Sequence, residues 1–249
     1  MRLPAQTDAV PDADSDTAPL RAVLWDMDGT LVDTEPYWIV AEGELVAAHG
    51  GTWSHEQAMR LVGQALPTSA GILQDAGVAL DKREIIDRLT ERVIEQLGEA
   101  VPWRPGAQEL LASLSEEGVA CGLVTMSERP MVEKILDQLP TGAFRAVVTG
   151  DAVTHGKPHP EPYLKGLARL THEIDGLTPS ECVAIEDSTP GASSAEAAGL
   201  TTIVVPSAVA VPPELGAAQW ETLAGRTPAD LARVLLARNS ADFVGQARA

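Results

Sequence analysis

The fold of this chain is decided by the stretch Arg21-Ala22-Val23-Leu24-Trp25-Asp26-Met27-Asp28-Gly29-Thr30. Four of the five residues before Asp26 are apolar, which is typical of a short strand buried on both faces of a sheet. Asp26 and Asp28 point to the same side while the strand lasts, and Gly29 then lets the backbone turn without a Cβ clash. Two like charges held together repel each other and lose hydration, so this strand end needs a cation or a proton.

Length and charge restrict what the chain can bind. Its 249 residues can bury a full core, and its formal net charge of -18 arises from 36 acidic and 18 basic residues. Such a field disfavours nucleic acid and anionic membranes, and no apolar run approaches the length needed to cross a bilayer. We therefore expect neither as a partner. The same field repels a phosphorylated substrate unless a local cation reverses its sign.

The N-terminal residues and the two cysteines bear on location. Residues 1–19 are rich in aspartate and proline and lack the basic start and apolar middle of a secretory signal, so we expect a disordered leader. Cys121 and Cys182 each lie in an apolar run, so buried free thiols are expected, as in a reducing compartment. We expect a cytoplasmic protein, and a monomer.

A helical block follows the first strand. From residue 34 to about residue 98 the apolar residues recur at helical spacing, and no strand pattern interrupts them. A block of this size suits a small helical domain inserted into a larger one. We therefore predict a helical cap over residues 34–101, a core made of residues 20–33 and 102–240, and a loose tail over residues 241–249.

The second half of the chain alternates between helix and strand patterns. We expect further strands at residues 119–125, 143–148, 182–185 and 201–205, with helices between them. Ser127 is expected to cap the helix after the second strand. The alternation predicts an α/β fold, a doubly wound parallel-sheet core of Rossmann-like type, with ligands at the carboxyl ends of the strands.

Polar residues follow the predicted strands, where this fold would place reactive groups. They are Asp26 and Asp28, the run Thr125-Met126-Ser127, the run Glu186-Asp187-Ser188, and Lys157 in the loop Gly156–Pro162. Two acidic clusters on neighbouring strands would create an oxygen-rich site for a hard cation such as Mg²⁺. A lysine and a hydroxyl at a helix start would hold a phosphate beside it.

At this point the chain resembles the haloacid dehalogenase superfamily. The resemblance rests on four motifs in this order: Asp26-x-Asp28-Gly29-Thr30, Thr125-x-Ser127, Gly156-Lys157-Pro158-x-Pro160 and Glu186-Asp187-Ser188-x-x-Gly191. It covers about residues 20–205 and is nearest to the phosphatase and β-phosphoglucomutase-like branch, whose members carry a helical cap after the first strand.

This resemblance implies roles for individual residues. Asp26 would be the nucleophile and Asp28 the general acid and base, while Thr125 would bind phosphate and Lys157 would hold both the nucleophile and the phosphate. The positions expected near the phosphate are Gly29, Thr125, Met126, Ser127 and Lys157. The expected Mg²⁺ ligands are Asp26, the backbone carbonyl of Asp28, and Asp187 with support from Glu186.

The reaction implied is hydrolysis of a small phosphorylated metabolite, such as a sugar phosphate or a phosphoglycolate-like acid, through an aspartyl-phosphate intermediate. One alternative is a phosphosugar mutase. Mutases of this branch place a histidine shortly after the nucleophile, where this chain has Trp38. Another alternative is a non-catalytic protein that binds a phosphorylated ligand, against which the complete motif set argues. Dehalogenases usually lack the second aspartate, which is Asp28 here, and many relatives carry asparagine at Met126.

The five histidines carry no role in this interpretation. They are scattered along the chain and are expected to be structural or solvated: His49, His55, His155, His159 and His172.

Overall fold

The computed structural model describes residues 20–62 and 64–246, so the predicted leader over residues 1–19 lies outside it. Within this part, six parallel strands form one sheet in the order β3-β2-β1-β4-β5-β6. The strands are β1 (Ala22–Trp25), β2 (Ala120–Val124), β3 (Ala146–Val148), β4 (Cys182–Glu186), β5 (Thr201–Val204) and β6 (Ala218–Gln219). The prediction of a doubly wound parallel sheet is confirmed; β6 was not predicted.

The carboxyl ends of the central strands β1, β2 and β4 lie beside one another. Trp25, the last residue of β1, is paired with Leu123 of β2 on one side and with Ile185 of β4 on the other. Side chains that follow directly after these strands are therefore brought to the same edge of the sheet.

Helices cover both faces of the sheet, as the unbroken apolar run of β1 requires. Val23 and Trp25 belong to a core cluster that includes residues of α5 (Ala107–Glu116) and α9 (Pro228–Gln246). Ala22 and Leu24 belong to a second cluster on the other face, under α7 (Glu161–Thr171) and α8 (Thr189–Ala197). Two short 3₁₀ turns, Gly150–Ala152 and Pro179–Glu181, complete the core.

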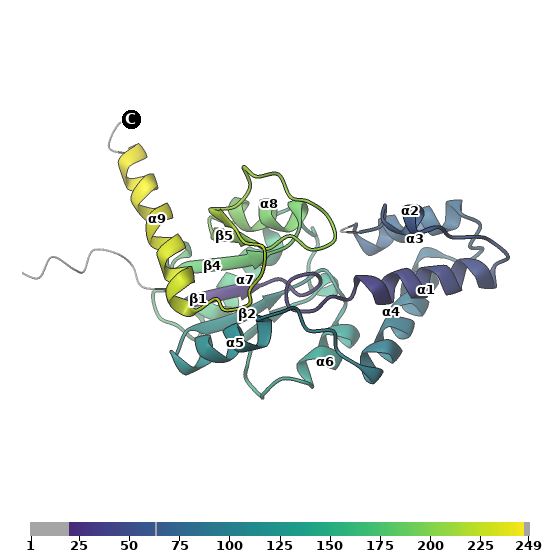
Figure 1. Ribbon diagram of the computed structural model, residues 1–249, viewed down its shortest axis with the longest axis horizontal. Coiled ribbons are helices and arrows are strands. Elements are labelled where there is room, and N and C mark those ends of the chain that lie inside the picture. Colours follow the sequence, from purple (N-terminus) through teal and green to yellow (C-terminus); the bar gives the residue numbers. More distant parts are fainter. Residues whose placement is uncertain (1–19, 63, 247–249) are drawn as a thin grey trace, which may run out of the picture.

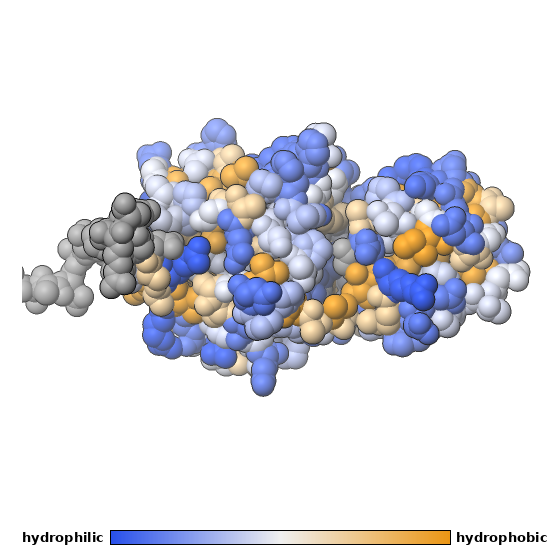
Figure 2. Space-filling view, turned by 90° about the horizontal axis from the view of Figure 1, so that it is seen from above, coloured by the Kyte–Doolittle hydropathy of each residue, from blue (hydrophilic) through white to orange (hydrophobic). Residues whose placement is uncertain are grey.

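Four helices between β1 and α5 form a separate lobe. They are α1 (Glu35–Ala48), α2 (His55–Ala58), α3 (Leu66–Asp75) and α4 (Lys82–Glu99). Figure 1 shows them grouped beside the sheet, at the end toward which β1 runs, and Figure 2 shows a furrow between the two lobes. The long helix α4 packs against α1 and α3, and also against α6 (Arg129–Leu136) of the core. The prediction of a helical cap is confirmed.

Two expectations about helix ends were wrong. Ser127 does not cap α6, because the helix begins at Arg129 with Glu128 as its N-cap residue. Pro130 lies in the first turn of α6, a position that proline favours, and the helix starts one residue later than expected. Helix α9 continues to Gln246, so the loose tail predicted from residue 241 is helical up to that residue, and residues 247–249 lie outside the described part.

Two further expectations concern chemistry and membranes. Cys121 and Cys182 are buried and free, as predicted. In the described part of the chain, no helix combines the length and the apolar character that crossing a bilayer requires.

Candidate active site

One buried lysine joins two carboxylates at the edge of the sheet. Nζ of Lys157 donates to Oδ1 of Asp26 and to Oε1 of Glu186, both at 2.6 Å, and to the carbonyl oxygen of Val124 at 3.0 Å. The side chains of Lys157, Asp26 and Glu186 are 6%, 9% and 0% exposed. The ammonium group therefore connects the ends of β1, β2 and β4 out of contact with bulk water.

Burial and charge act against each other in this cluster. Burial lowers the pKa of Lys157, but the charges of Asp26 and Glu186 offset this and hold that pKa above its usual value. Burial and the charge of Asp26 raise the pKa of Glu186 to about 7, although Lys157 and the Tyr163 hydroxyl oppose this shift. The cluster carries more negative charge than one lysine balances, so a further cation would be favourable here.

Asp28 lies in a different environment from Asp26. Its Oδ1 accepts a hydrogen bond from the Thr34 hydroxyl at 2.5 Å, and its Oδ2 accepts from the hydroxyls of Ser127 at 2.6 Å and Thr125 at 3.2 Å. Burial raises the pKa of Asp28, and the hydrogen bonds from Ser127 and Thr34 only partly oppose this. One aspartate is thus held by a cation and its neighbour by neutral hydroxyls.

The residues expected to hold a metal come together in part. One carboxylate oxygen each from Asp26, Glu186 and Asp187 lies within 4.8 Å of the others. Oδ2 of Asp26 is buried and has no hydrogen-bond partner among the described residues. Burial raises the pKa of Asp187 well above its usual value, and the charges of Asp26 and Glu186 add to this. Three crowded carboxylates with an unpartnered buried oxygen match the donor set of a hard divalent cation.

Two glycines make room for these acidic side chains. Gly29 has a φ of 85°, and a Cβ on it would lie 2.0 Å from Oδ2 of Asp187. A Cβ on Gly191 would lie 1.9 Å from Oε2 of Glu186. Glycine is therefore required at both positions, because the carboxylates pack directly against the backbone.

Of the other predicted phosphate-binding positions, Thr125 and Ser127 contact Asp28, and Met126 contacts the loop that carries Lys157. The hydroxyl of Thr125 accepts a hydrogen bond from the backbone N–H of Ser127 at 3.0 Å. The hydroxyls of Thr125 and Ser127 both donate to Asp28. The sulfur of Met126 accepts the backbone N–H of Lys157 at 3.2 Å, so Met126 packs against the lysine loop. The roles of Gly29, Thr125, Met126 and Ser127 toward a substrate stay predictions.

Sequence reasoning missed two residues of the site. Thr34 donates to Asp28, and the hydroxyl of the fully buried Tyr163 donates to Oε1 of Glu186 at 2.6 Å. In the sequence, Tyr163 falls in the apolar stripe that it shares with Leu167 and Leu170 of α7. A hydroxyl within that stripe was the available signal, because a buried phenol needs a hydrogen-bond partner.

A salt bridge links the cap to the core beside the site. Nη1 and Nη2 of Arg83, in α4, donate to the two carboxylate oxygens of Glu128 at 2.6 and 2.8 Å. Glu128 directly follows Ser127, whose hydroxyl contacts Asp28. This bidentate pair connects the cap to the core at the rim of the site.

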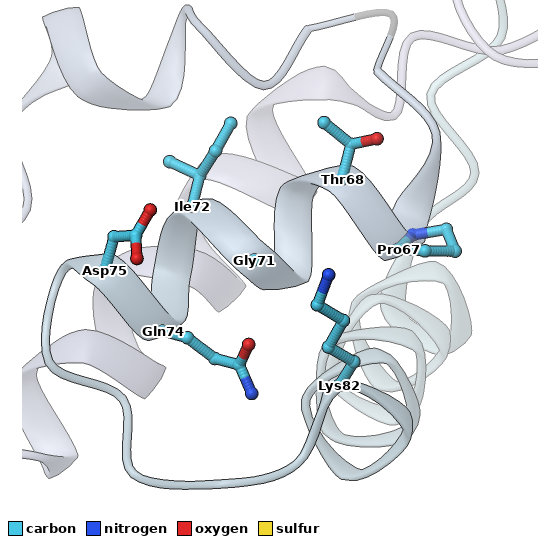
Figure 3. A pocket seen from close by; sticks show the side chains of 7 residues that line it. All are labelled: Pro67, Thr68, Gly71, Ile72, Gln74, Asp75 and Lys82. Carbon is cyan, nitrogen blue, oxygen red and sulfur yellow. The ribbon is translucent and has the colours of Figure 1, made fainter.

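The cap also carries a hollow of its own. It has a volume of about 530 Å³ and lies between α3 and the start of α4. Figure 3 shows the side chain of Lys82 extending toward Gly71. Its lining residues are Pro67, Thr68, Gly71, Ile72, Gln74, Asp75 and Lys82. None of these belongs to the carboxylate site, so the hollow is a separate feature.

Comparison with known proteins agrees with this arrangement. Hexitol phosphatase B of Escherichia coli is 33% identical over 197 residues, which cover 75% of this chain and 83% of that protein. N-acetylmuramic acid 6-phosphate phosphatase of Pseudomonas aeruginosa is 34% identical over 206 residues, covering 81% and 88%. The crystal structure of CbbY from Rhodobacter sphaeroides in complex with phosphate superposes with a TM-score of 0.76 at 27% identity, covering 85% of this chain and 99% of that one.

Residues 23–205 match the haloacid dehalogenase-like hydrolase family, a range that contains all four motifs and the inserted helices. The chain therefore belongs to the haloacid dehalogenase-like hydrolases, and within them to the phosphatases that carry a helical cap.

Proposed function

We propose that this enzyme is a Mg²⁺-dependent phosphatase of small phosphorylated sugars or sugar alcohols, with Asp26 as its nucleophile. The observation that carries the proposal is the state of the Asp26 carboxylate. Lys157 holds one of its oxygens at 2.6 Å, and the other is buried without a partner among the described residues. A carboxylate fixed at one oxygen and open at the other is oriented to act on a substrate or a metal.

The residues present fit Mg²⁺. Asp26 and Asp187 would be its carboxylate ligands, Glu186 would support them, and the backbone carbonyl of Asp28 is the further ligand that the resemblance implies. The ion, when bound, would neutralise charge on the phosphate. Lys157 would add to that effect from the other side of Asp26.

The chain's own residues would carry the reaction in two steps. The Asp26 carboxylate attacks phosphorus, the bond to the leaving oxygen breaks, and Asp28 gives that oxygen its proton. Water then attacks phosphorus of the aspartyl-phosphate, Asp28 takes a proton from this water, and inorganic phosphate leaves as the Asp26 carboxylate is restored. Asp28 suits the proton transfers because it lies beside Asp26 and is bound by hydroxyl groups rather than by Lys157.

The substrate class is supported by the names of two relatives. Hexitol phosphatase B and a phosphorylated carbohydrates phosphatase of Thermotoga maritima, 30% identical over 189 residues, are named for sugar-type substrates. We propose that residues 34–101 close over such a substrate and exclude water from the aspartyl-phosphate. In this proposal the enzyme acts as a cytoplasmic monomer, without nucleic acid or membrane partners.

Hydrolysis of a panel of sugar, sugar-alcohol and acid phosphates, with and without Mg²⁺, tests the proposal. We expect Mg²⁺-dependent release of phosphate from wild type and none from Asp26→Asn. Asp28→Asn should slow turnover by about 10²–10⁴-fold, the usual contribution of a general acid or base. Wild-type rates in purified, folded Asp26→Asn would overturn the assignment. Absence of hydrolysis across the whole panel would favour a protein that only binds a phosphorylated ligand.

A mutase is the second candidate, because a putative β-phosphoglucomutase of Thermotoga maritima superposes with a TM-score of 0.66 at 26% identity. Trp38 stands where the mutases place a histidine, which disfavours this activity. A coupled isomerisation assay separates the two, since a mutase returns the phosphoryl group to a sugar instead of releasing it to water.

A further inference from the structure

A second group of metal-binding side chains lies on the loop that carries Lys157. One ligand atom each from His155, His159 and Glu161 lies within 4.8 Å of the others. The two imidazole rings are 4.7 Å apart between centroids and inclined at 32°. Both histidines are exposed, whereas the Lys157 side chain between them in sequence is buried against Asp26. The loop therefore presents two imidazoles to solvent and one ammonium to the interior.

Glu161 holds the backbone of this loop in place. Its two carboxylate oxygens accept the backbone N–H groups of Thr154 at 2.8 Å and His155 at 2.9 Å. Lys165, one helical turn further on, bonds the same carboxylate and, with these N–H groups, holds the pKa of Glu161 well below its usual range. The carboxylate is therefore ionised at neutral pH, and the backbone of His155 is already ordered.

Each histidine is also positioned. Nδ1 of His155 lies 3.0 Å from Oε2 of Glu161 and donates its proton to it, and a metal ion that binds both atoms would take the place of this proton. The backbone carbonyl of His159 accepts the hydroxyl of Ser194, in α8, at 2.7 Å, and its Nδ1 accepts the backbone N–H of Glu161 at 3.1 Å. Both rings are thus attached to an ordered backbone.

We propose that His155, His159 and Glu161 form a second metal site, which takes a borderline ion such as Zn²⁺ or Ni²⁺ and discriminates against Mg²⁺. Imidazole nitrogens suit these ions, while Mg²⁺ demands oxygen ligands in an octahedral arrangement. Two imidazoles and one carboxylate leave a position for water, as the exposure of the rings allows. Metal binding would displace the proton shared by His155 and Glu161, and would turn the exposed His159 ring away from the Glu161 N–H so that its nitrogen becomes available. The site is independent of the proposed function.

The test is a calorimetric titration of untagged, full-length protein with Ni²⁺ at pH 8 in the presence of excess Mg²⁺. We expect one equivalent of Ni²⁺ to bind wild type, and at least a tenfold loss of affinity in His155→Asn and in His159→Asn. His172→Asn is the matched control, because His172 is an exposed histidine at the end of α7, outside the cluster. Ni²⁺ should also raise the melting temperature of wild type and of the control, but not of the other two variants.

Two results would overturn the proposal. One is equal binding of Ni²⁺ to His155→Asn, His159→Asn and His172→Asn. The other is loss of the bound equivalent in Asp187→Asn with retention in His155→Asn, which would assign the ion to the carboxylate site. Circular dichroism of each variant confirms that it is folded, and hydrolysis in Mg²⁺ alone reports separately on the proposed function.

Discussion

The core and the cap each bury a glutamate with a raised pKa, but the two carboxyls differ in what surrounds them. In the core, burial and the charge of Asp26 raise the pKa of Glu186 to about 7 against the opposing charge of Lys157. In the cap, burial raises the pKa of Glu42 to about 7, and a hydrogen bond from the neutral indole N–H of Trp53 at 3.1 Å opposes it. The core thus collects several acids around one cation, whereas the cap holds its acid with a neutral donor.

A pair of glycines shows the same contrast. Gly29 in the core has a φ of 85° and touches Asp187 so closely that a Cβ would lie 2.0 Å from Oδ2. Gly50, which follows α1 in the cap, has a φ of 77° and nothing within 4 Å of a Cβ. Positive φ favours glycine at both positions, but only the core glycine also makes space for a carboxylate of the candidate site.

The largest expected effect comes from removing the core cation. Lys157→Met leaves Asp26 and Glu186 buried without their shared donor, and breaking a buried ion pair costs about 3–5 kcal/mol. We also expect turnover to fall by about 10²–10³-fold or more, because a positioned charge beside the reacting group is lost. Urea unfolding and steady-state hydrolysis measure the two effects. Near-wild-type stability would mean that Lys157 does not balance these carboxylates.

Alanine substitutions at Gly29 and Gly50 distinguish the effect of backbone strain from the effect of a Cβ that overlaps Asp187. Gly29→Ala and Gly50→Ala should each lose roughly 1–2 kcal/mol of stability from their positive φ, and Gly29→Ala should lose more because its Cβ would also overlap Asp187. Only Gly29→Ala should also weaken Mg²⁺ activation, since its Cβ displaces Asp187. Activity measured against Mg²⁺ concentration decides this. An identical Mg²⁺ dependence in the two variants would contradict the assignment of Asp187 as a Mg²⁺ ligand.

The smallest effect concerns the cap acid and pH. The pKa of Glu42 in the folded state lies above its usual value of 4.5, so the folded state binds more protons and this group makes stability fall as pH rises from about 4.5 through 7. Glu42→Gln should therefore gain stability relative to wild type at pH 8 but not at pH 4.5. Glu91→Gln, at an exposed position of α4, should show the same difference at both pH values. Unfolding curves at the two pH values are the measurement.

Local patterns were enough to predict the sheet and the polar residues at its edge. Asp26, Thr125 and Glu186 end or follow strands whose apolar runs are visible in the sequence, and a parallel sheet brings such ends together. The helical spacing between β1 and α5 likewise predicted the cap. These features depend on residues close together in the chain.

What was missed depends on contacts between distant residues. Ser127 reads as a helix cap from its neighbours, yet its hydroxyl donates to Asp28, 99 residues away in sequence. Tyr163 reads as an apolar position, yet it donates to Glu186 from another element. Strand β6 has only two residues and no pattern of its own, and the last turns of α9 follow a polar run that resembles a chain end.

The ion pair between Arg83 and Glu128 should make the contact between cap and core depend on ionic strength. The Arg83 side chain is 54% exposed and that of Glu128 is 20% exposed, so dissolved ions reach the bond directly. A movement of the cap away from the core would break this ion pair, and dissolved salt weakens the pair by screening its charges. If the cap closes over the substrate as proposed, the Arg83–Glu128 pair would favour the closed arrangement by about 1 kcal/mol at most, and we expect this contribution to shrink as ionic strength rises.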